Sequence, residues 1–182
     1  MSTVPRPDQL TGDYVFDTAR TRVAFVARHT MSTRVRGHFA EFAGGARLDG
    51  DDPSRSRAWL TAEARSVRTG NRLRDDLVWG KFLDGDRHPA LSFTSTEVSR
   101  VDEAHYTVAG DLAVRDVVRQ VVLDLTLTGG GTDADGGAHV AFRGGATIDR
   151  KGWGVDWNAL TSVMVAPRVV LELDVVAVRE RR

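Results

Sequence analysis

Five histidines are the first residues of this chain that could do chemistry, because a neutral imidazole binds metal ions and exchanges protons near pH 7. They are His29, His38, His88, His105 and His139. A zinc site needs three or four ligands and a supporting shell, and no spacing among the five provides a third ligand. His29 and His38 could face each other across a hairpin, but we expect both to be surface or hairpin-end residues. The sequence therefore predicts no metal site.

Carboxylates and nucleophiles give no stronger indication of catalysis. The run Arg74-Asp75-Asp76 offers acid–base groups, but on a short arginine-rich helix such residues more often form solvated ion pairs or caps. There is no cysteine, and no serine lies in a nucleophile elbow. Gly129-Gly130-Gly131 lacks the strand–glycine–helix spacing of a phosphate-binding loop. We therefore expect no catalytic residue, no cofactor and no enzyme activity.

The rest of the chain consists mainly of alternating strands. The clearest set of apolar residues at every second position is Val121, Leu123, Leu125 and Leu127. Asp124 and Thr126 lie between them. Because successive side chains of a strand point to opposite faces, we expect the four apolar residues to point inward and the two polar ones outward.

Residues 66–93 are the one long stretch without this alternation. Leu73 and Leu77 have helical spacing and follow Thr69-Gly70-Asn71, a turn that can cap a helix. Gly80 is expected to end the helix, as a glycine just past a helix end usually does. A helix this short is unstable alone, so Leu73, Leu77 and Trp79 are expected to lie on an apolar surface.

These elements predict an all-β fold, namely a single extended antiparallel β-barrel of about eight strands with one short inserted α-helix. A sheet of this size removes its edges best by closing on itself. A barrel of about eight strands holds either side chains or one small ligand. Several inward positions are small, which favours a ligand cavity over a filled interior: Ala27, Gly37, Ala58, Ala62, Ala64, Gly110, Gly144 and Ala146.

An aromatic stretch at 151–158 bears on how such a barrel would end. Trp153 and Trp157 lie four residues apart among glycines. This pattern is typical of a rigid mouth or lid, and equally of a barrel end plugged by aromatic packing. Trp79 and Phe82 could cover the same end or the opposite one.

Composition limits the partners. The chain has 182 residues, with 25 Lys and Arg against 25 Asp and Glu, so its formal net charge of zero does not favour nucleic acid. No apolar run is long enough to span a membrane, and the first residues lack the apolar core of a secretory signal, so a cytoplasmic protein is expected. We divide the chain into a flexible lead (1–12), a barrel domain (13–178) and a charged tail (179–182).

Four patches together are similar to a known family. They are Tyr14–Asp17 with Val23–His29; Val35–Phe39; Ser66–Asn71 through Arg74-Asp75 to Phe82–Asp84 and His88-Pro89; and Ile148–Lys151 to Trp157-Asn158. In this order and spacing the chain resembles the YceI-like family, the lipocalin-like polyisoprenoid-binding proteins. The resemblance implies a lipocalin-like barrel with a helix beside it and a long apolar pore that binds isoprenoid quinones or related lipids without catalysis. It also implies a homodimer.

The predicted function is that of a carrier for one long apolar ligand. Its predicted ligand-binding residues are Val23, Phe25, Phe39, Leu60, Phe93, Tyr106, Leu112, Phe142 and Ile148 along the cavity, with Phe82 and Trp157 near its ends. Two alternatives stay open: a filled-barrel dimeric stress or structural protein, and an enzyme acting on a small apolar substrate.

Overall fold

The computed structural model describes residues 3–29, 34–155 and 165–181. The strands of these residues are β1 (Gly12–Phe16), β2 (Arg22–His29), β3 (Arg34–Phe39), β4 (Phe42–Leu48), β5 (Arg57–Glu63), β6 (Val67–Arg68), β7 (Ala90–Arg100), β8 (His105–Val114), β9 (Val117–Thr132), β10 (Ala138–Asp149) and β11 (Val165–Arg179). One α-helix, α1 (Arg72–Leu77), continues into a π-helical turn, η4 (Val78–Phe82). Short 3-10 turns lie at η1 (Pro7–Gln9), η2 (Pro53–Arg55), η3 (Ala64–Ser66) and η5 (Arg150–Trp153).

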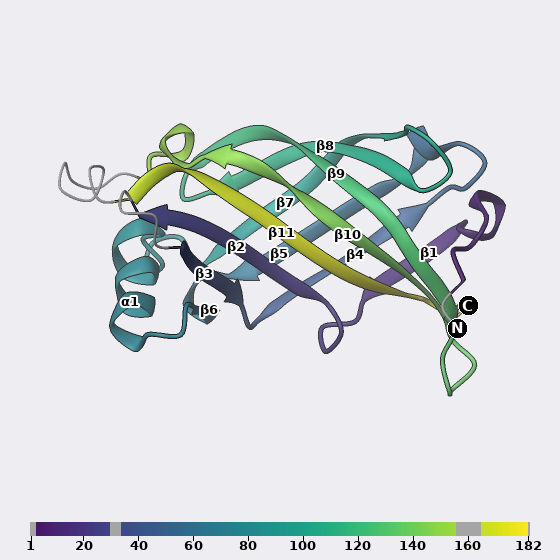
Figure 1. Cartoon of the computed structure of the whole chain (residues 1–182), viewed down its shortest axis with the longest axis horizontal. Coiled ribbons are helices and arrows are strands. Elements are labelled where there is room, and N and C mark those ends of the chain that lie inside the picture. Colours follow the sequence, from purple (N-terminus) through teal and green to yellow (C-terminus); the bar gives the residue numbers. More distant parts are fainter. Residues whose placement is uncertain (1–2, 30–33, 156–164, 182) are drawn as a thin grey trace.

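Eight of the described strands close into an antiparallel barrel (Figure 1). Their order is β1-β4-β5-β7-β8-β9-β10-β11, and β11 returns to β1 through the pairs Tyr14–Arg179 and Val15–Val178. Closure leaves this ring without a free edge, which is the stable solution for a long twisted sheet. The predicted all-β barrel with one short helix is confirmed.

One end of the barrel is completed differently. Beyond its pairing with β1, β11 pairs with β2, which pairs with β3, which pairs with β6. Strand β6 has only two residues, and among the described strands its one partner is β3. The chain then runs through α1 and η4 before β7 begins. This segment lies at the end of the barrel where β6 and β7 are not paired with each other in the described sheet (Figure 1). We call this the α1 end.

The predicted inward face of β9 is confirmed. Val121, Leu123 and Leu127 are buried, Leu125 is half-buried against the same interior, and Asp124 is exposed. Because side chains alternate between the two faces of a strand, a one-residue shift in register would turn all of these apolar side chains outward.

The expected apolar packing is wrong for Leu73, holds only in part for Leu77, which also lines the interior, and is confirmed for Trp79. Leu73 is 82% exposed and Leu77 is 40% exposed. Two hydrogen bonds hold the helix instead: the Thr69 backbone nitrogen donates to the Asp75 carboxylate, and the Asn71 side-chain oxygen accepts from the Arg74 backbone nitrogen. The apolar anchor lies one turn later, where Val78, Trp79, Phe82 and Leu83 pack with Trp153 in a core cluster.

The expected helix end is also wrong. Helix α1 stops at Leu77, and Gly80 lies in the middle of the π-helical turn that follows. Phe82, the last residue of this π-helical turn, lines the barrel interior.

The opposite end of the barrel is covered by the residues before β1. Turn η1 packs against Gly50, where an added Cβ would lie 1.6 Å from the Pro7 carbonyl oxygen. Leu10 is 4% exposed, and its carbonyl accepts a 2.8 Å hydrogen bond from the Tyr14 hydroxyl. The division into lead, barrel and tail remains a prediction, but residues 7–10 close one end of the interior. Within the described part of the chain, no helix is long and apolar enough to cross a membrane.

Candidate functional site

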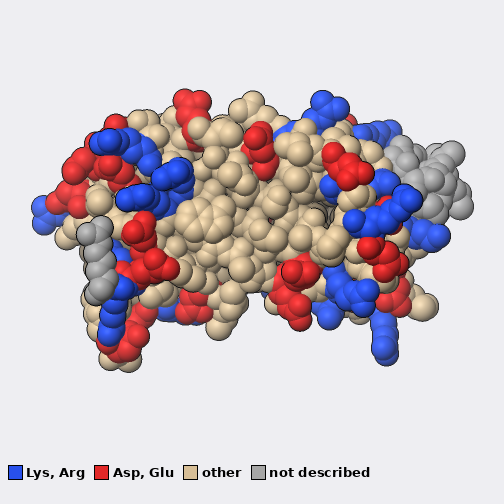
Figure 2. Space-filling view, turned by 180° about the vertical axis from the view of Figure 1, so that it is seen from behind, with Lys and Arg blue, Asp and Glu red and all other residues tan. Residues whose placement is uncertain are grey.

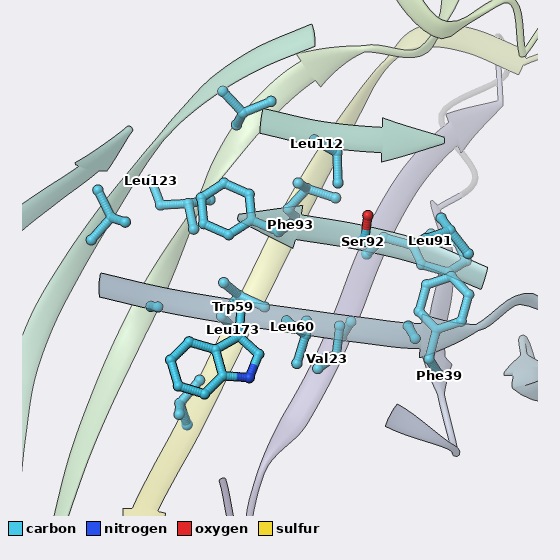
Figure 3. Close-up of a pocket in the computed structure, with 18 of the residues that line it drawn as sticks. Val23, Phe39, Trp59, Leu60, Leu91, Ser92, Phe93, Leu112, Leu123 and Leu173 are labelled. Carbon is cyan, nitrogen blue, oxygen red and sulfur yellow. The ribbon is translucent and has the colours of Figure 1, made fainter. Parts of the chain in front are cut away.

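A single elongated cavity of about 570 Å³ occupies the barrel interior. Side chains from every strand of the closed ring line it, and apolar atoms make up nearly all of its wall. Figure 3 shows Val23, Leu60, Phe93 and Leu123 projecting from different strands toward the same space. A volume of this size lies within the range of roughly 300–1,000 Å³ that is usual for small-molecule sites.

The inward glycines do not create this space, contrary to expectation. At Gly37 an added Cβ would lie 2.3 Å from the Phe25 ring, and at Gly110 it would lie 2.5 Å from the Phe93 ring. Each glycine therefore makes room for an aromatic ring of a neighbouring strand. At Gly144 the added atom would lie 1.9 Å from the Asp124 carbonyl oxygen, so that glycine allows close strand approach.

The inward alanines behave as expected in part. Ala27, Ala58 and Ala62 line the cavity, and their short side chains leave its middle open. Ala64 is instead fully buried in the core cluster of the α1 end, and Ala146 packs against that cluster. Ala24, Ala46 and Ala177 line the cavity as well, so small side chains on four strands leave room for a ligand.

Two aromatic contacts shape the wall. The rings of Phe25 and Phe39 lie 5.9 Å apart in a tilted arrangement, and those of Tyr106 and Phe142 meet edge-on at 5.9 Å. Such geometries are favourable beyond the area that they bury. Burial raises the pKa of Tyr106 above its ordinary value.

At the α1 end, a polar cluster joins the helix to the barrel. The Asp75 carboxylate accepts hydrogen bonds of 2.6 Å from both the backbone nitrogen and the hydroxyl of Thr69. The Arg74 guanidinium donates to the Thr69 hydroxyl and carbonyl at 2.9 and 2.6 Å. Arg74 and Leu77 also line the cavity, so the cavity reaches α1.

A second cation lies in the wall at this end. Arg150 is only 6% exposed, and its guanidinium donates a 2.6 Å hydrogen bond to the Val155 carbonyl. Trp153 closes the wall nearby, with its indole nitrogen bonded to the Leu112 carbonyl at 2.8 Å. The 151–158 stretch therefore contributes aromatic packing through Trp153.

Titratable groups do not converge inside the cavity. Among the described residues that line it, Asp49 supplies the one carboxylate, and none is a histidine. The Asp49 carboxylate accepts hydrogen bonds from the backbone nitrogens of Asp51 and Asp52, which organises a loop at the end opposite α1. A pair of groups placed for acid–base chemistry is not found among these residues.

Comparison with known proteins identifies the family. The model of the YceI-like domain matches residues 14–177, which is nearly the whole barrel. The chain belongs to the YceI-like family. It is 32% identical over 176 residues to a UPF0312 protein of Pectobacterium carotovorum, covering 94% of this chain and 89% of that one. A UPF0312 protein of Pseudomonas aeruginosa is 33% identical over 135 residues, covering 73% of this chain and 70% of that one.

Solved structures share the YceI-like fold at lower identity. The crystal structure of Burkholderia cenocepacia BcnA superposes with a TM-score of 0.80 at 22% identity, covering 88% of this chain and 98% of that one. A polyisoprenoid binding domain from Saccharophagus degradans, implicated in plant cell wall breakdown, has a TM-score of 0.70 at 14% identity, covering 92% and 98%. At these identities the likeness shows the fold.

The structure brings ten of the predicted binding residues of this YceI-like barrel to the cavity wall. They are Val23, Phe25, Phe39, Leu60, Phe82, Phe93, Tyr106, Leu112, Phe142 and Ile148. Phe82 lies at the α1 end, and Trp157 lies outside the described residues. Their role in binding a ligand stays a prediction.

Several wall residues were not anticipated from the sequence. Leu10 lies before the first strand of the barrel, where no alternation marked it as inward. Arg74 and Arg150 are cations in an apolar wall, which hydrophobic patterning does not select. The one available indication was that Arg150 follows directly on the inward alternation that ends at Ile148.

Proposed function

We propose that this protein is a non-catalytic binding protein that holds one long apolar molecule, a polyisoprenoid, isoprenoid quinone or similar lipid, inside the barrel. The observation that carries the proposal is the continuous apolar cavity of about 570 Å³. Membership of the YceI-like family and the fold shared with a polyisoprenoid binding domain support it.

The energetics of the cavity suit a long chain. Each buried methylene contributes about 0.8 kcal/mol, so an isoprenoid tail supplies more than enough to offset the cost of ordering it. Apolar contacts along a tail discriminate weakly between similar chains. Selectivity is therefore expected from the charged residues at the cavity ends, Arg74 and Arg150 at one and Asp49 and Arg57 at the other.

The two alternatives have less support. A filled barrel would leave no continuous space, whereas a cavity extends along this interior. An enzyme would use converging acid and base groups, whereas the described wall is almost entirely apolar. The homodimer and the cytoplasmic location stay predictions, and analytical ultracentrifugation would test the first.

The test is a substitution that fills the cavity. Ala62 is buried and lines the cavity, whereas the next residue back on the same strand, Thr61, is exposed on the outer face. Ala62→Trp is expected to weaken binding of a long isoprenoid quinone to lipid-stripped protein by about tenfold or more, because the indole occupies the volume that the chain needs. Native mass spectrometry of the titrated protein measures it.

The matched control is Thr61→Trp, which adds the same ring outside the barrel and should leave binding unchanged. Circular dichroism verifies that both variants are folded. Failure of the unmodified, lipid-stripped protein to bind an isoprenoid of any chain length at micromolar concentration would contradict the carrier proposal and favour the filled barrel. Equal binding by both variants would place the ligand elsewhere.

A further inference from the structure

The formal net charge is zero, but the charges are distributed unequally along the barrel axis. The connections at the α1 end are 64–89, 115–116 and 150–155, and those at the opposite end are 3–11, 49–56, 101–104, 133–137 and 180–181. In Figure 2, seen from behind, charged residues gather toward the two ends and a largely uncharged band lies between them.

The sign of the charge differs between the ends. Among the described residues, the α1-end connections carry nine basic residues, Arg65, Arg68, Arg72, Arg74, Lys81, Arg87, Arg115, Arg150 and Lys151, against five acidic ones, Asp75, Asp76, Asp84, Asp86 and Asp116. The opposite connections carry three basic residues, Arg6, Arg55 and Arg181, against nine acidic ones, Asp8, Asp49, Asp51, Asp52, Asp102, Glu103, Asp133, Asp135 and Glu180. The connections of the α1 end are thus net positive, and those of the opposite end are net negative.

The α1 end also exposes apolar side chains. Leu73 is 82% exposed and Leu77 is 40% exposed, both on α1, and Arg72 beside Leu73 is exposed as well. The fold does not need Leu73 at the surface, since Thr69 and Asn71 hold the helix through hydrogen bonds. An exposed leucine among cations is typical of segments that lie in the interface of an anionic membrane.

We propose that the α1 end docks on an anionic lipid bilayer, with Leu73 inserted between the lipids and the surrounding cations against their headgroups. Basic residues close to an anionic surface each strengthen binding roughly fivefold at moderate salt. The net negative connections of the opposite end would be repelled by the same surface, so the charge distribution also sets the orientation of the barrel. A flat membrane fits this arrangement better than a protein groove, because the cations are distributed over three connections of the end.

Docking in this orientation would join the cavity to the bilayer. Arg74 and Leu77 belong both to α1 and to the cavity wall. The helix that contacts the membrane would therefore also border the cavity. An apolar chain could then pass between lipid and barrel without crossing water. This transfer role rests on the proposed function, whereas docking itself does not.

Asp76 is an opposing charge within the patch. It is exposed and lies three residues after Leu73, on the same side of the helix. Its carboxylate weakens attraction to an anionic surface, which makes it a test site where a substitution should increase binding. A gain confined to the anionic vesicles identifies attraction to the charged surface, whereas misfolding would increase binding to neutral vesicles as well.

Vesicle co-flotation tests docking with the lipid-stripped full chain. The protein should float with vesicles of phosphatidylcholine mixed with phosphatidylglycerol, and much less with pure phosphatidylcholine or at high salt. Leu73→Ser and Arg72→Glu should each reduce binding, by about tenfold and by at least fivefold respectively. Asp76→Asn should increase it by roughly twofold to fivefold.

Matched controls lie at the opposite end. Val101→Ser removes another exposed apolar residue, 67% exposed in the β7–β8 turn, and Arg55→Glu reverses an exposed arginine of η2. Both should leave flotation unchanged. No binding to anionic vesicles, or equal effects of the two sets of variants, would overturn the docking proposal and assign the patch to a protein partner or to solvent. Because no ligand is present, this result is independent of the isoprenoid titration.

Discussion

The two ends of the barrel are closed by different forces. At the end opposite α1, Leu10 and Tyr14 are almost completely buried, and the Arg179 guanidinium lies 5.4 Å from the Tyr14 ring centre while donating to its hydroxyl at 2.9 Å. At the α1 end, the helix presents its leucines to solvent and is joined to the barrel through Thr69, Arg74 and Asp75. The end opposite α1 is closed by apolar packing, whereas α1 itself is held by hydrogen bonds and the apolar packing begins only in the turn that follows it, with Val78 and Trp79.

This difference indicates which end can open. Apolar packing is lost only when buried area is exposed, which costs about 25 cal/mol per Å². A hydrogen bond is exchanged for one with water at a net cost of only about 1 kcal/mol. We therefore expect a ligand to enter beside α1.

The largest loss of stability is expected from a substitution in the apolar packing at the end opposite α1. Tyr14→Ala removes a fully buried ring and should lower the free energy of unfolding by about 3–5 kcal/mol, because the site cannot collapse around the lost volume. Urea denaturation measures the change. Tyr14→Phe keeps the ring and removes the hydroxyl that donates to Leu10, so it should cost only about 1 kcal/mol. Equal losses for the two variants would show that the hydroxyl, rather than packing, closes this end.

A smaller loss of stability, confined to the helix segment, is expected from a substitution at the α1 end. Thr69→Val removes the hydroxyl that donates to Asp75 and accepts from Arg74. Opening of residues 72–82 should become easier by about 1–3 kcal/mol, as measured by amide hydrogen exchange, with little change in the barrel strands. Thr61→Val, on an exposed strand position, is the control. Global unfolding by Thr69→Val would mean that α1 is part of the core rather than a separable closure.

The smallest change in stability is expected from lowering the pH. Arg20 bridges Asp17 and Asp133, and its hydrogen bonds lower the pKa of both carboxyl groups. A lowered folded-state pKa adds stability above the unfolded value of about 3.9, and that stability is lost as pH falls through the folded value. Stability measured by urea denaturation should therefore decline below about pH 4.

Arg20→Met provides the comparison for this acid dependence. The substitution should make the decline shallower, because both carboxyl groups then titrate nearer their ordinary values. Both carboxyl groups are in partial contact with solvent, which screens their attraction to Arg20, so only a small change is expected. Unchanged acid dependence in the variant would show that other carboxylates control stability in this range.

The strand pattern was sufficient to predict the barrel and much of its wall. Side-chain period two follows from backbone geometry alone, so the inward face of Val121, Leu123 and Leu127 could be assigned without the structure. The lone break in that period, between β6 and β7, also located the inserted helix. The four sequence patches that resemble the YceI-like family also predicted the family correctly, as the domain match shows.

Which small residues leave space was decided only by the tertiary structure. Gly37 and Ala62 both point inward, but Phe25 occupies the space above Gly37 whereas the space beside Ala62 is open. Whether the space beside a small residue is open depends on which residue of the adjacent strand lies opposite it. That pairing is set by the strand register, which the sequence of one strand does not determine by itself.

The roles of the two ends also depended on the tertiary structure. The spacing of Leu73 and Leu77 was correct for a helix, but it could not reveal that polar contacts from Thr69 would hold that helix and leave both leucines exposed. Leu10 showed no alternation, yet it is buried because the chain before β1 folds back over Gly50. Local pattern determines which residues share a face, whereas contacts between segments far apart in the chain determine whether that face is covered.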